Sequence, residues 1–300
     1  MKKIHFSNVN FESRTGPNTF ASRLAKELYS RGYKIVDKHD SYDVFLCFIE
    51  PDSMPIAQSK FIQRLDGIWF KPDEFEKNNR NIKWAYDNCD HVIWQSNFDK
   101  SMTQKWWGEK EGSVIHNGIK LKKIDVVNED ILRIKSRFER IFVCAANWHR
   151  QKRLKENVDF FKLNSSNNDV LIVLGNNPDS HVQEDNILYC GNVSHDLCLQ
   201  IYAIADWFVH LAWLDHCPNV VVEALSQGCK IICTNSGGTH EIVKNNGIIL
   251  EELIPYSFDL CDYDNPPKLK LKKIDLYSKI MIENDYLCIK KVTDKYLSLF

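Results

Sequence analysis

Segment 214–228 of the chain reads LDHCPNVVVEALSQG and carries two carboxylates, Asp215 and Glu223, on either side of a proline. Proline suits the first position of a helix and disfavours helical geometry in the residue before it, so we expect a helix to begin near Pro218. Asp215 then precedes this helix, whereas Glu223 projects from it more than one turn along. The two acids are therefore not neighbours on one helical face.

The start of this helix is a candidate anion site. Its first backbone N–H groups, those of Asn219, Val220 and Val221, have no acceptor inside the helix and lie at the positive end of its dipole. A phosphate bound there would have one carboxylate on each side, and carboxylates accept hydrogen bonds from sugar hydroxyls. The arrangement indicates a nucleotide sugar, with the diphosphate in the middle and a sugar at each end.

Segment 214–228 is also compatible with an ordinary helix or with a metal site. A capped helix, with Asp215 solvated and Glu223 on a polar face, accounts for the segment alone equally well. A metal site accounts for it less well, because Asp215, His216 and Cys217 in direct succession cannot easily chelate one ion. No second ligand cluster such as HExxH occurs either, so we expect no bound metal.

Composition and motifs exclude several classes of protein. The chain has 300 residues, 44% of them hydrophobic and 26% charged, which is ordinary for a soluble globular protein. Its 39 basic and 40 acidic residues leave a net charge of −1, so no basic field predicts nucleic-acid binding. We see neither a signal peptide nor an apolar run of about 18 residues, and we expect a cytoplasmic protein without a transmembrane segment. The absence of GxGxxG and GxxxxGK[ST] argues against dinucleotide oxidoreductases and P-loop enzymes.

Short apolar runs alternate with longer amphipathic runs, a pattern typical of α/β proteins. The expected strands of the first half are KKIHFSNV, YKIVD, YDVFLCF, KFIQRLD and HVIWQS. A polar connection, KLKKIDVVNEDI, follows, and the pattern then restarts with the expected strands IFVCAAN, DVLIVLG, ILYCGNV, WFVHLA and KIICTN. Two doubly wound units in tandem, with a cleft between them, are the architecture that this order predicts.

Segment 214–228 also belongs to a longer pattern, HLAWLDHCPNVVVEALSQGCKIICTNSGGTHEIV, which resembles the signature of family 4 retaining glycosyltransferases. That signature contains an acid, seven residues, a Glu, then Ala, Gly, an apolar strand and a Gly-Gly-x-x-Glu loop. VIHNGI is similar to the family's interdomain turn, and CAANWHRQKRL to its first strand and phosphate loop in the second domain. The resemblance implies the GT-B fold, with two Rossmann-like doubly wound domains facing a cleft. Residues 1–120 would form the acceptor side, residues 121–283 would bind the donor, and the C-terminal helix at 284–300 would pack back on the first domain.

The resemblance implies roles for the charged residues. Glu223 would accept hydrogen bonds from the nucleotide ribose, and Asp215, where the family usually has Glu, would hold hydroxyls of the transferred sugar. Lys152 would neutralise the diphosphate. The family's second basic residue corresponds to Asn147 in this chain, and Arg150 would take its place, since a guanidinium suits phosphate geometry.

Further residues are assigned by the same resemblance. Gly16 would let the backbone approach the phosphates, because it has no Cβ. Asp66, together with Arg64, ends an expected strand of the first half and is a candidate for contact with the sugar or the acceptor. The remaining donor-binding candidates are the helix start and the second glycine loop, namely Pro218, Asn219, Val220, Gly237, Gly238 and Thr239.

The function that follows is retaining transfer of a sugar from a nucleotide sugar to an acceptor hydroxyl. The diphosphate's developing charge would be stabilised by Lys152, Arg150 and the helix start, without a metal, a protein nucleophile or a cofactor besides the donor. The acceptor, whether glycan, lipid-linked or other, is not identified. Two alternatives stay open: a subunit that binds a nucleotide sugar without transferring it, and a GT-B sugar-nucleotide epimerase.

Overall fold

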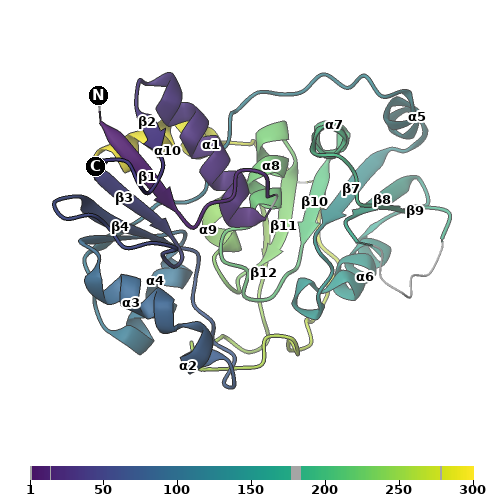
Figure 1. Ribbon diagram of the computed structural model, residues 1–300. Coiled ribbons are helices and arrows are strands. Elements are labelled where there is room, and N and C mark those ends of the chain that lie inside the picture. Colours follow the sequence, from purple (N-terminus) through teal and green to yellow (C-terminus); the bar gives the residue numbers. More distant parts are fainter. Residues whose placement is uncertain (1, 14, 177–183, 278) are drawn as a thin grey trace.

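The computed structural model describes residues 2–13, 15–176, 184–277 and 279–300, and it has two domains side by side, each built on one parallel sheet (Figure 1). In the first domain the strand order is β2-β1-β3-β4-β5-β6, and in the second it is β12-β11-β10-β7-β8-β9. Helices cover the sheets, so the two doubly wound units that the sequence predicted are confirmed.

The first sheet consists of β1 (Lys3–Ser7), β2 (Lys34–Val36), β3 (Val44–Phe48), β4 (Lys60–Leu65), β5 (His91–Trp94) and β6 (Gly112–Val114). Its helices are α1 (Gly16–Ser30), α2 (Phe75–Asn78), α3 (Arg80–Asn88) and α4 (Asn97–Trp107). Every residue of β3 is buried, because successive side chains point to opposite faces and both faces are covered. Val44, Leu46 and Phe48 pack towards α1, whereas Phe45 and Cys47 pack towards α3 and α4.

The second sheet consists of β7 (Arg140–Ala145), β8 (Asp169–Leu174), β9 (Ile187–Gly191), β10 (Trp207–His210), β11 (Lys230–Thr234) and β12 (Gly247–Leu250). Its helices are α5 (Glu129–Arg137), α6 (Leu154–Asn164), α7 (His195–Ile204), α8 (Asn219–Gln227) and α9 (Thr239–Val243), and a 3-10 turn, η1 (Arg150–Lys152), precedes α6. The strands that the sequence predicted are present. The helices α4, α5 and α6 were not predicted, and α5 begins inside the stretch that we interpreted as a connection.

The chain crosses between the domains again after β12. The described residues of 251–283, which we call the crossover segment, form no helix or strand. Tyr256, Phe258 and Tyr263 pack on the core of the first domain, and a later part of the segment covers one face of the second sheet through Leu269, Leu271 and Ile274. A second 3-10 turn, η2 (Asp285–Leu287), then leads into α10 (Ile289–Leu297), which packs on α1 of the first domain (Figure 1).

Candidate functional site

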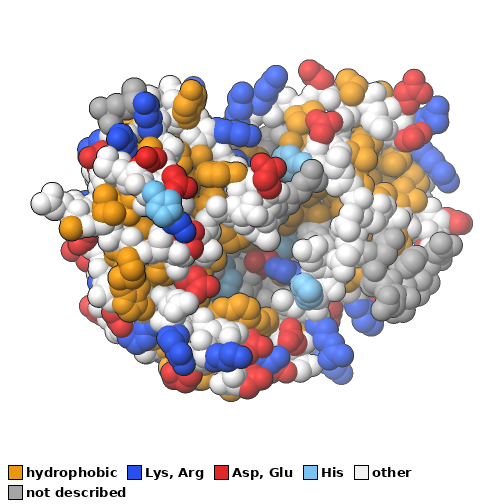
Figure 2. Space-filling model, viewed as in Figure 1, with side chains coloured by type: hydrophobic (Ala, Val, Ile, Leu, Met, Phe, Trp, Pro, Cys, Tyr) orange, Lys and Arg blue, Asp and Glu red, His pale blue; other side chains and the backbone are white. Residues whose placement is uncertain are grey.

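A cleft of about 900 Å³ lies between the two domains. Figure 2 shows this hollow in the middle of the face, with acidic, basic and histidine side chains inside it. Both domains line it: the start of α1 and the end of β4 from the first domain, and the loops after β7 and β10 from the second. Most of the predicted site residues are among the lining residues, namely Gly16, Asp66, Asn147, Lys152, Asp215, Pro218, Asn219, Val220 and Glu223.

Asp215 is held by two neighbours at the bottom of the cleft. Lys152 Nζ lies 2.5 Å and His210 Nε2 2.9 Å from the same carboxylate oxygen, Oδ2. Burial alone would raise the pKa of Asp215, but the Lys152 ammonium and His210 outweigh it and hold the pKa well below its usual range. His210 was not among the predicted site residues, yet the structure places its ring directly on the carboxylate of Asp215.

Glu223 is buried on α8 and forms an ion pair with Arg23, which comes from α1 of the other domain. His195 Nε2 lies 3.2 Å from the same oxygen of Glu223. Burial raises the pKa of Glu223, but His195 and Arg23 together lower it below the usual value. Neither partner was identified from the sequence, and no motif indicates them, because Arg23 meets Glu223 only when the two domains come together.

The helix start provides fewer free amides than predicted. Pro218 is the N-cap residue of α8, and its carbonyl accepts from Val221 N at 3.1 Å and from Val222 N at 3.3 Å. The prediction that Val221 offers a free N–H was therefore wrong, because the first turn tightens onto Pro218. Asn219 and Val220 keep amides without an acceptor inside the helix, and Asn219 Nδ2 donates to the Gly16 carbonyl at 2.9 Å.

Gly16 opens α1 directly across the cleft from the start of α8. A Cβ on Gly16 would come no closer than 3.5 Å to Asn219 Nδ2, which is an ordinary contact. The protein's own packing therefore does not require glycine at this position, and the reason that the resemblance implies, close approach to a phosphate, stays a prediction.

The glycine loop after β11 lies behind the site. Gly237 has φ +70° and Gly238 N donates to the Asp215 carbonyl at 2.7 Å. A Cβ on Gly237 would clash with the backbone of Asp215, and one on Gly238 would clash with the His216 carbonyl. Gly237, Gly238 and the buried Thr239 are not among the cleft-lining residues, so these residues position the Asp215 loop from behind rather than facing the cleft.

Arg150 does not face the cleft either. Its side chain is exposed, and Nη1 lies 3.3 Å from Asn265 Oδ1 of the crossover segment. The prediction that Arg150 pairs with Lys152 at a diphosphate therefore does not fit the structure, since η1 directs the two side chains differently. Asn147 does line the cleft, and the cations that line it in the described part of the chain, histidines aside, are Arg23, Lys26 and Lys152.

Asp66 lies at the end of β4 and lines both the cleft and a smaller neighbouring pocket. It forms an ion pair with the buried Arg64, yet burial raises its pKa to about 6, because desolvation exceeds the attraction of the guanidinium and the nearby Asp99 adds repulsion. Gly67, at φ +109°, leaves room for the His216 ring, which any Cβ there would meet. Asp66 is thus placed where the first domain meets the Asp215 loop.

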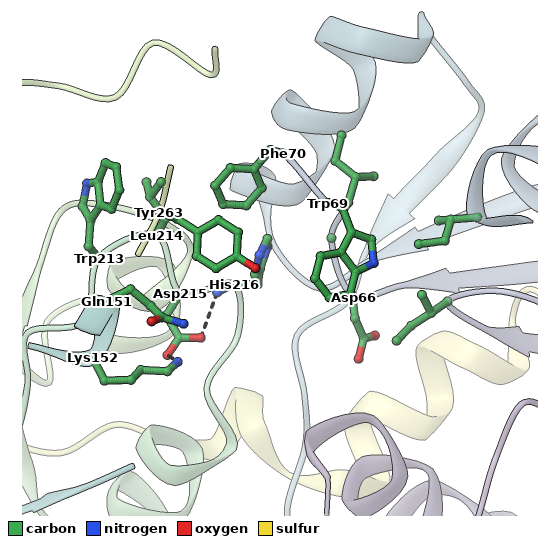
Figure 3. A pocket seen from close by; sticks show the side chains of 14 residues that line it. Asp66, Trp69, Phe70, Gln151, Lys152, Trp213, Leu214, Asp215, His216 and Tyr263 are labelled. Atoms are coloured by element: carbon green, nitrogen blue, oxygen red, sulfur yellow. Dashed lines mark hydrogen bonds and ion pairs between the residues drawn. The ribbon is translucent and has the colours of Figure 1, made fainter. Parts of the chain in front are cut away.

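The smaller pocket has a volume of about 270 Å³ and adjoins the cleft through the four residues that line both, Asp66, Lys152, Asp215 and His216. Figure 3 shows Trp69 facing Tyr263 across this pocket, with Asp66 below Trp69 and the pair of Lys152 and Asp215 on the opposite side. The sequence did not indicate this pocket, because its walls come from several segments that are distant in the chain.

The middle part of the chain matches a known family. Residues 129–252 match the family model described as Glycosyl transferases group 1. This range contains Lys152, Asp215 and Glu223, whereas Arg23 and Asp66 lie outside it. No curated protein matches the chain by sequence.

Solved structures of low sequence identity share the fold. HepE of Anabaena, crystallised with UDP-glucose, is 17% identical over 84% of this chain and 86% of that one, with a TM-score of 0.61. Sucrose-phosphate synthase of Thermosynechococcus elongatus is 12% identical over 88% and 87%, with a TM-score of 0.63. WaaG, a glycosyltransferase involved in lipopolysaccharide biosynthesis, is 13% identical over 84% and 87%, with a TM-score of 0.60. The fold is therefore the GT-B fold that the sequence resemblance implied.

The described part of the chain contains neither a metal-binding cluster nor a membrane-spanning helix. Within residues 2–13, 15–176, 184–277 and 279–300, no group of three or more His, Cys, Asp or Glu side chains is placed to hold a metal ion. No helix in these ranges is both long enough and apolar enough to cross a membrane.

Proposed function

We propose that the protein is a glycosyltransferase that transfers a sugar from a nucleotide-diphosphate donor to an acceptor hydroxyl. The observation that carries this proposal is the arrangement of Lys152, Asp215 and Glu223 around the start of α8, inside one interdomain cleft. Supporting it are the match of residues 129–252 to group 1 glycosyl transferases and the GT-B fold. HepE, which has this fold, was crystallised with UDP-glucose, and we extend that ligand class to this chain.

In this proposal the diphosphate lies against the amides of Asn219 and Val220, between Lys152 and Arg23. The helix dipole and the two cations together favour a doubly charged anion at that point. The ribose lies at Glu223, whose lowered pKa keeps it an ionised acceptor for two hydroxyls. The transferred sugar lies at Asp215, which Lys152 and His210 hold in place.

The reaction that we propose is retaining and independent of metal, as in the family 4 enzymes that the motif resembles. Departure of the diphosphate places negative charge beside Lys152 and Arg23, which stabilise it as it forms. Asp215 is held by Lys152 and His210, so it positions the sugar rather than attacking it. Retention predicts that the product has the anomeric configuration of the donor, which proton NMR of the product measures, and the rate should persist in EDTA.

The first experiment measures binding of UDP, GDP, ADP and dTDP, and of their sugars, by thermal shift and calorimetry. A ligand that binds only the folded state raises the melting temperature. Glu223→Ala should weaken binding of the best nucleotide by roughly 10-fold or more, because hydrogen bonds to a charged group contribute about 1.5–3 kcal/mol. Glu129→Ala removes an exposed glutamate and is the matched control.

Two outcomes would reject the proposal. If no nucleoside diphosphate stabilises the wild-type protein, the cleft is not a donor site. If nucleotides bind equally well to wild type and Glu223→Ala, the ribose does not lie at Glu223. Binding without any transfer or donor hydrolysis would instead favour the alternative of a non-transferring subunit.

A further inference from the structure

The smaller pocket has aromatic walls from separate parts of the chain. Trp69 and Phe70 follow β4 in the first domain, Trp213 follows β10 in the second, and Tyr263 belongs to the crossover segment (Figure 3). Phe70 and Trp213 are buried, but Trp69 is 42% exposed. An exposed tryptophan in a pocket wall presents an apolar face to whatever enters the pocket.

Trp69 is exposed but firmly positioned. Its backbone N–H donates to Asn79 Oδ1 at 2.9 Å, and its carbonyl accepts from Asn79 Nδ2 at 2.6 Å. Asn79 is itself buried, at the junction where α2 ends and α3 begins. The backbone from which Trp69 projects towards the pocket is therefore held by a dedicated side chain.

Tyr263 forms the opposite wall because the crossover segment is attached to the first domain. Its ring lies 5.0 Å from that of Phe70 between centroids. The neighbouring backbone contact, Cys261 N to the Phe70 carbonyl at 3.0 Å, and the Lys71–Asp264 ion pair at 3.1 Å hold the segment there. Two aromatic walls are thus placed by independent sets of contacts.

The pocket also offers oxygen acceptors. Gln151 Oε1 is buried and has no hydrogen-bond partner in the part of the chain that the structure describes. Gln151 lines the pocket, so its side-chain amide can exchange hydrogen bonds with a polar ligand. Asp66 adds a carboxylate where the pocket opens into the cleft. A ligand that fits must combine a C–H face for the rings with hydroxyl donors at its edges.

A sugar ring has this combination of surfaces. The negative face of an aromatic ring attracts the weakly positive C–H groups on one side of a pyranose, while its hydroxyls donate to carboxylate and amide oxygens. The volume of about 270 Å³ lies near the low end of the roughly 300–1,000 Å³ range of small-molecule sites, which suits one ring. An acyl chain would cover the charged pair of Lys152 and Asp215 without offering it hydrogen bonds, at a cost in free energy.

We propose that this pocket binds the acceptor, and that the acceptor is a sugar whose pyranose ring stacks on Trp69 with Tyr263 on its other side. The inference rests on the proposed function. The reacting hydroxyl lies at the junction beside Asp66, and the Asp66 carboxylate accepts a hydrogen bond from a neighbouring hydroxyl of the same ring, which positions the ring. Its oxygen bonds to the anomeric carbon while the bond from that carbon to the phosphate oxygen breaks. The electron pair leaves with the diphosphate, and the hydroxyl proton goes to the departing phosphate oxygen.

The test uses the full-length protein saturated with its best nucleoside diphosphate. Saturation-transfer NMR measures binding of methyl α- and β-pyranosides of glucose, galactose, mannose, N-acetylglucosamine and rhamnose. At least one glycoside should bind to the wild type. Trp69→Ala should weaken that binding at least 10-fold, whereas Trp69→Phe should recover most of it, because the phenyl ring keeps an aromatic face.

Controls separate this inference from the proposed function. Tyr29→Ala removes an exposed tyrosine on α1 and should leave glycoside binding unchanged. Nucleotide affinity and melting temperature, measured in every variant, should be unaffected by Trp69→Ala. Absence of glycoside binding to the wild type, or equal binding to wild type and Trp69→Ala, overturns the inference. Nucleotide binding then remains as the separate measure of the proposed function.

Discussion

The two halves of the site are assembled in different ways. The part of the cleft that we propose binds the donor comes mainly from the second domain, and Asp215, the start of α8 and Glu223 lie on one short stretch of the chain. The smaller pocket takes its walls mainly from the loop after β4, the turn η1, the loop after β10 and the crossover segment. A site within one stretch leaves a pattern in the sequence, whereas a site between distant segments leaves none that is visible without the fold.

The electrostatics of the two halves differ as well. On the donor side, Asp215 and Glu223 both have lowered pKa values, because cations and histidines lie against their carboxylates. On the other side, burial raises the pKa of Asp66 to about 6 although Arg64 is its partner. Asp215 and Glu223 therefore stay ionised near neutral pH, and Lys152 and Arg23 balance their charge. Asp66, on the side that we propose for the acceptor, changes protonation near pH 6.

The largest effect that this comparison predicts is at Lys152. Lys152→Ala should lower kcat/KM by about 2–4 kcal/mol of transition-state stabilisation, or roughly 30- to 900-fold, because in our proposal the cation faces the diphosphate as its charge develops. Lys155→Ala removes the same charge three residues away, where the side chain is exposed and paired with Asp159, and it should change little. Steady-state kinetics of the two variants would contradict the donor-side assignment if they lost activity equally.

The next largest effect that we predict is on nucleotide binding, and it should differ between Arg23 and Arg150. Arg23→Ala should weaken nucleoside diphosphate binding by roughly 10-fold or more, since a charge-assisted hydrogen bond contributes about 1.5–3 kcal/mol. Arg150→Ala should leave binding nearly unchanged, because its side chain lies at Asn265, outside the cleft. Calorimetry measures the affinity of both variants for the nucleoside diphosphate and shows which arginine contributes to binding. A loss confined to Arg150→Ala would restore the sequence-based assignment and would place the diphosphate elsewhere.

The smallest effect concerns the pH dependence on the acceptor side. The ionised Asp66 carboxylate is the stronger hydrogen-bond acceptor, and a pKa of about 6 means that it is ionised above that pH. The acceptor kcat/KM should therefore fall as the pH drops through 6, and Asp66→Asn should abolish this fall while costing about 0.5–1.5 kcal/mol at pH 8. If kcat/KM of Asp66→Asn still falls below pH 6 as in the wild type, the group responsible for that fall is not Asp66.

Much of the architecture was predictable because it depends on short-range patterns. The buried run of β3 and the spacing of Phe20, Leu24 and Leu28 on α1 follow from side-chain periodicity alone. The start of α8 followed from the preference of proline for a helix start. The missed helices start in polar sequence; α5, for example, begins at a side-chain cap provided by Asn128. Such short polar patterns favour a helix only weakly, and the helix becomes stable when it packs against the sheet.

The sequence by itself determined the alternating α/β order, the position of α8 and the two carboxylates beside its start, since these depend on neighbours within a few residues. Only the tertiary structure decided that Arg23 rather than Arg150 faces the cleft, that Gly237 and Gly238 support the Asp215 loop from behind, and that Tyr263 faces Trp69. The physical reason is that each of these contacts joins segments from different parts of the chain. Their distances are set by how two sheets and one crossover segment pack, which no local pattern encodes.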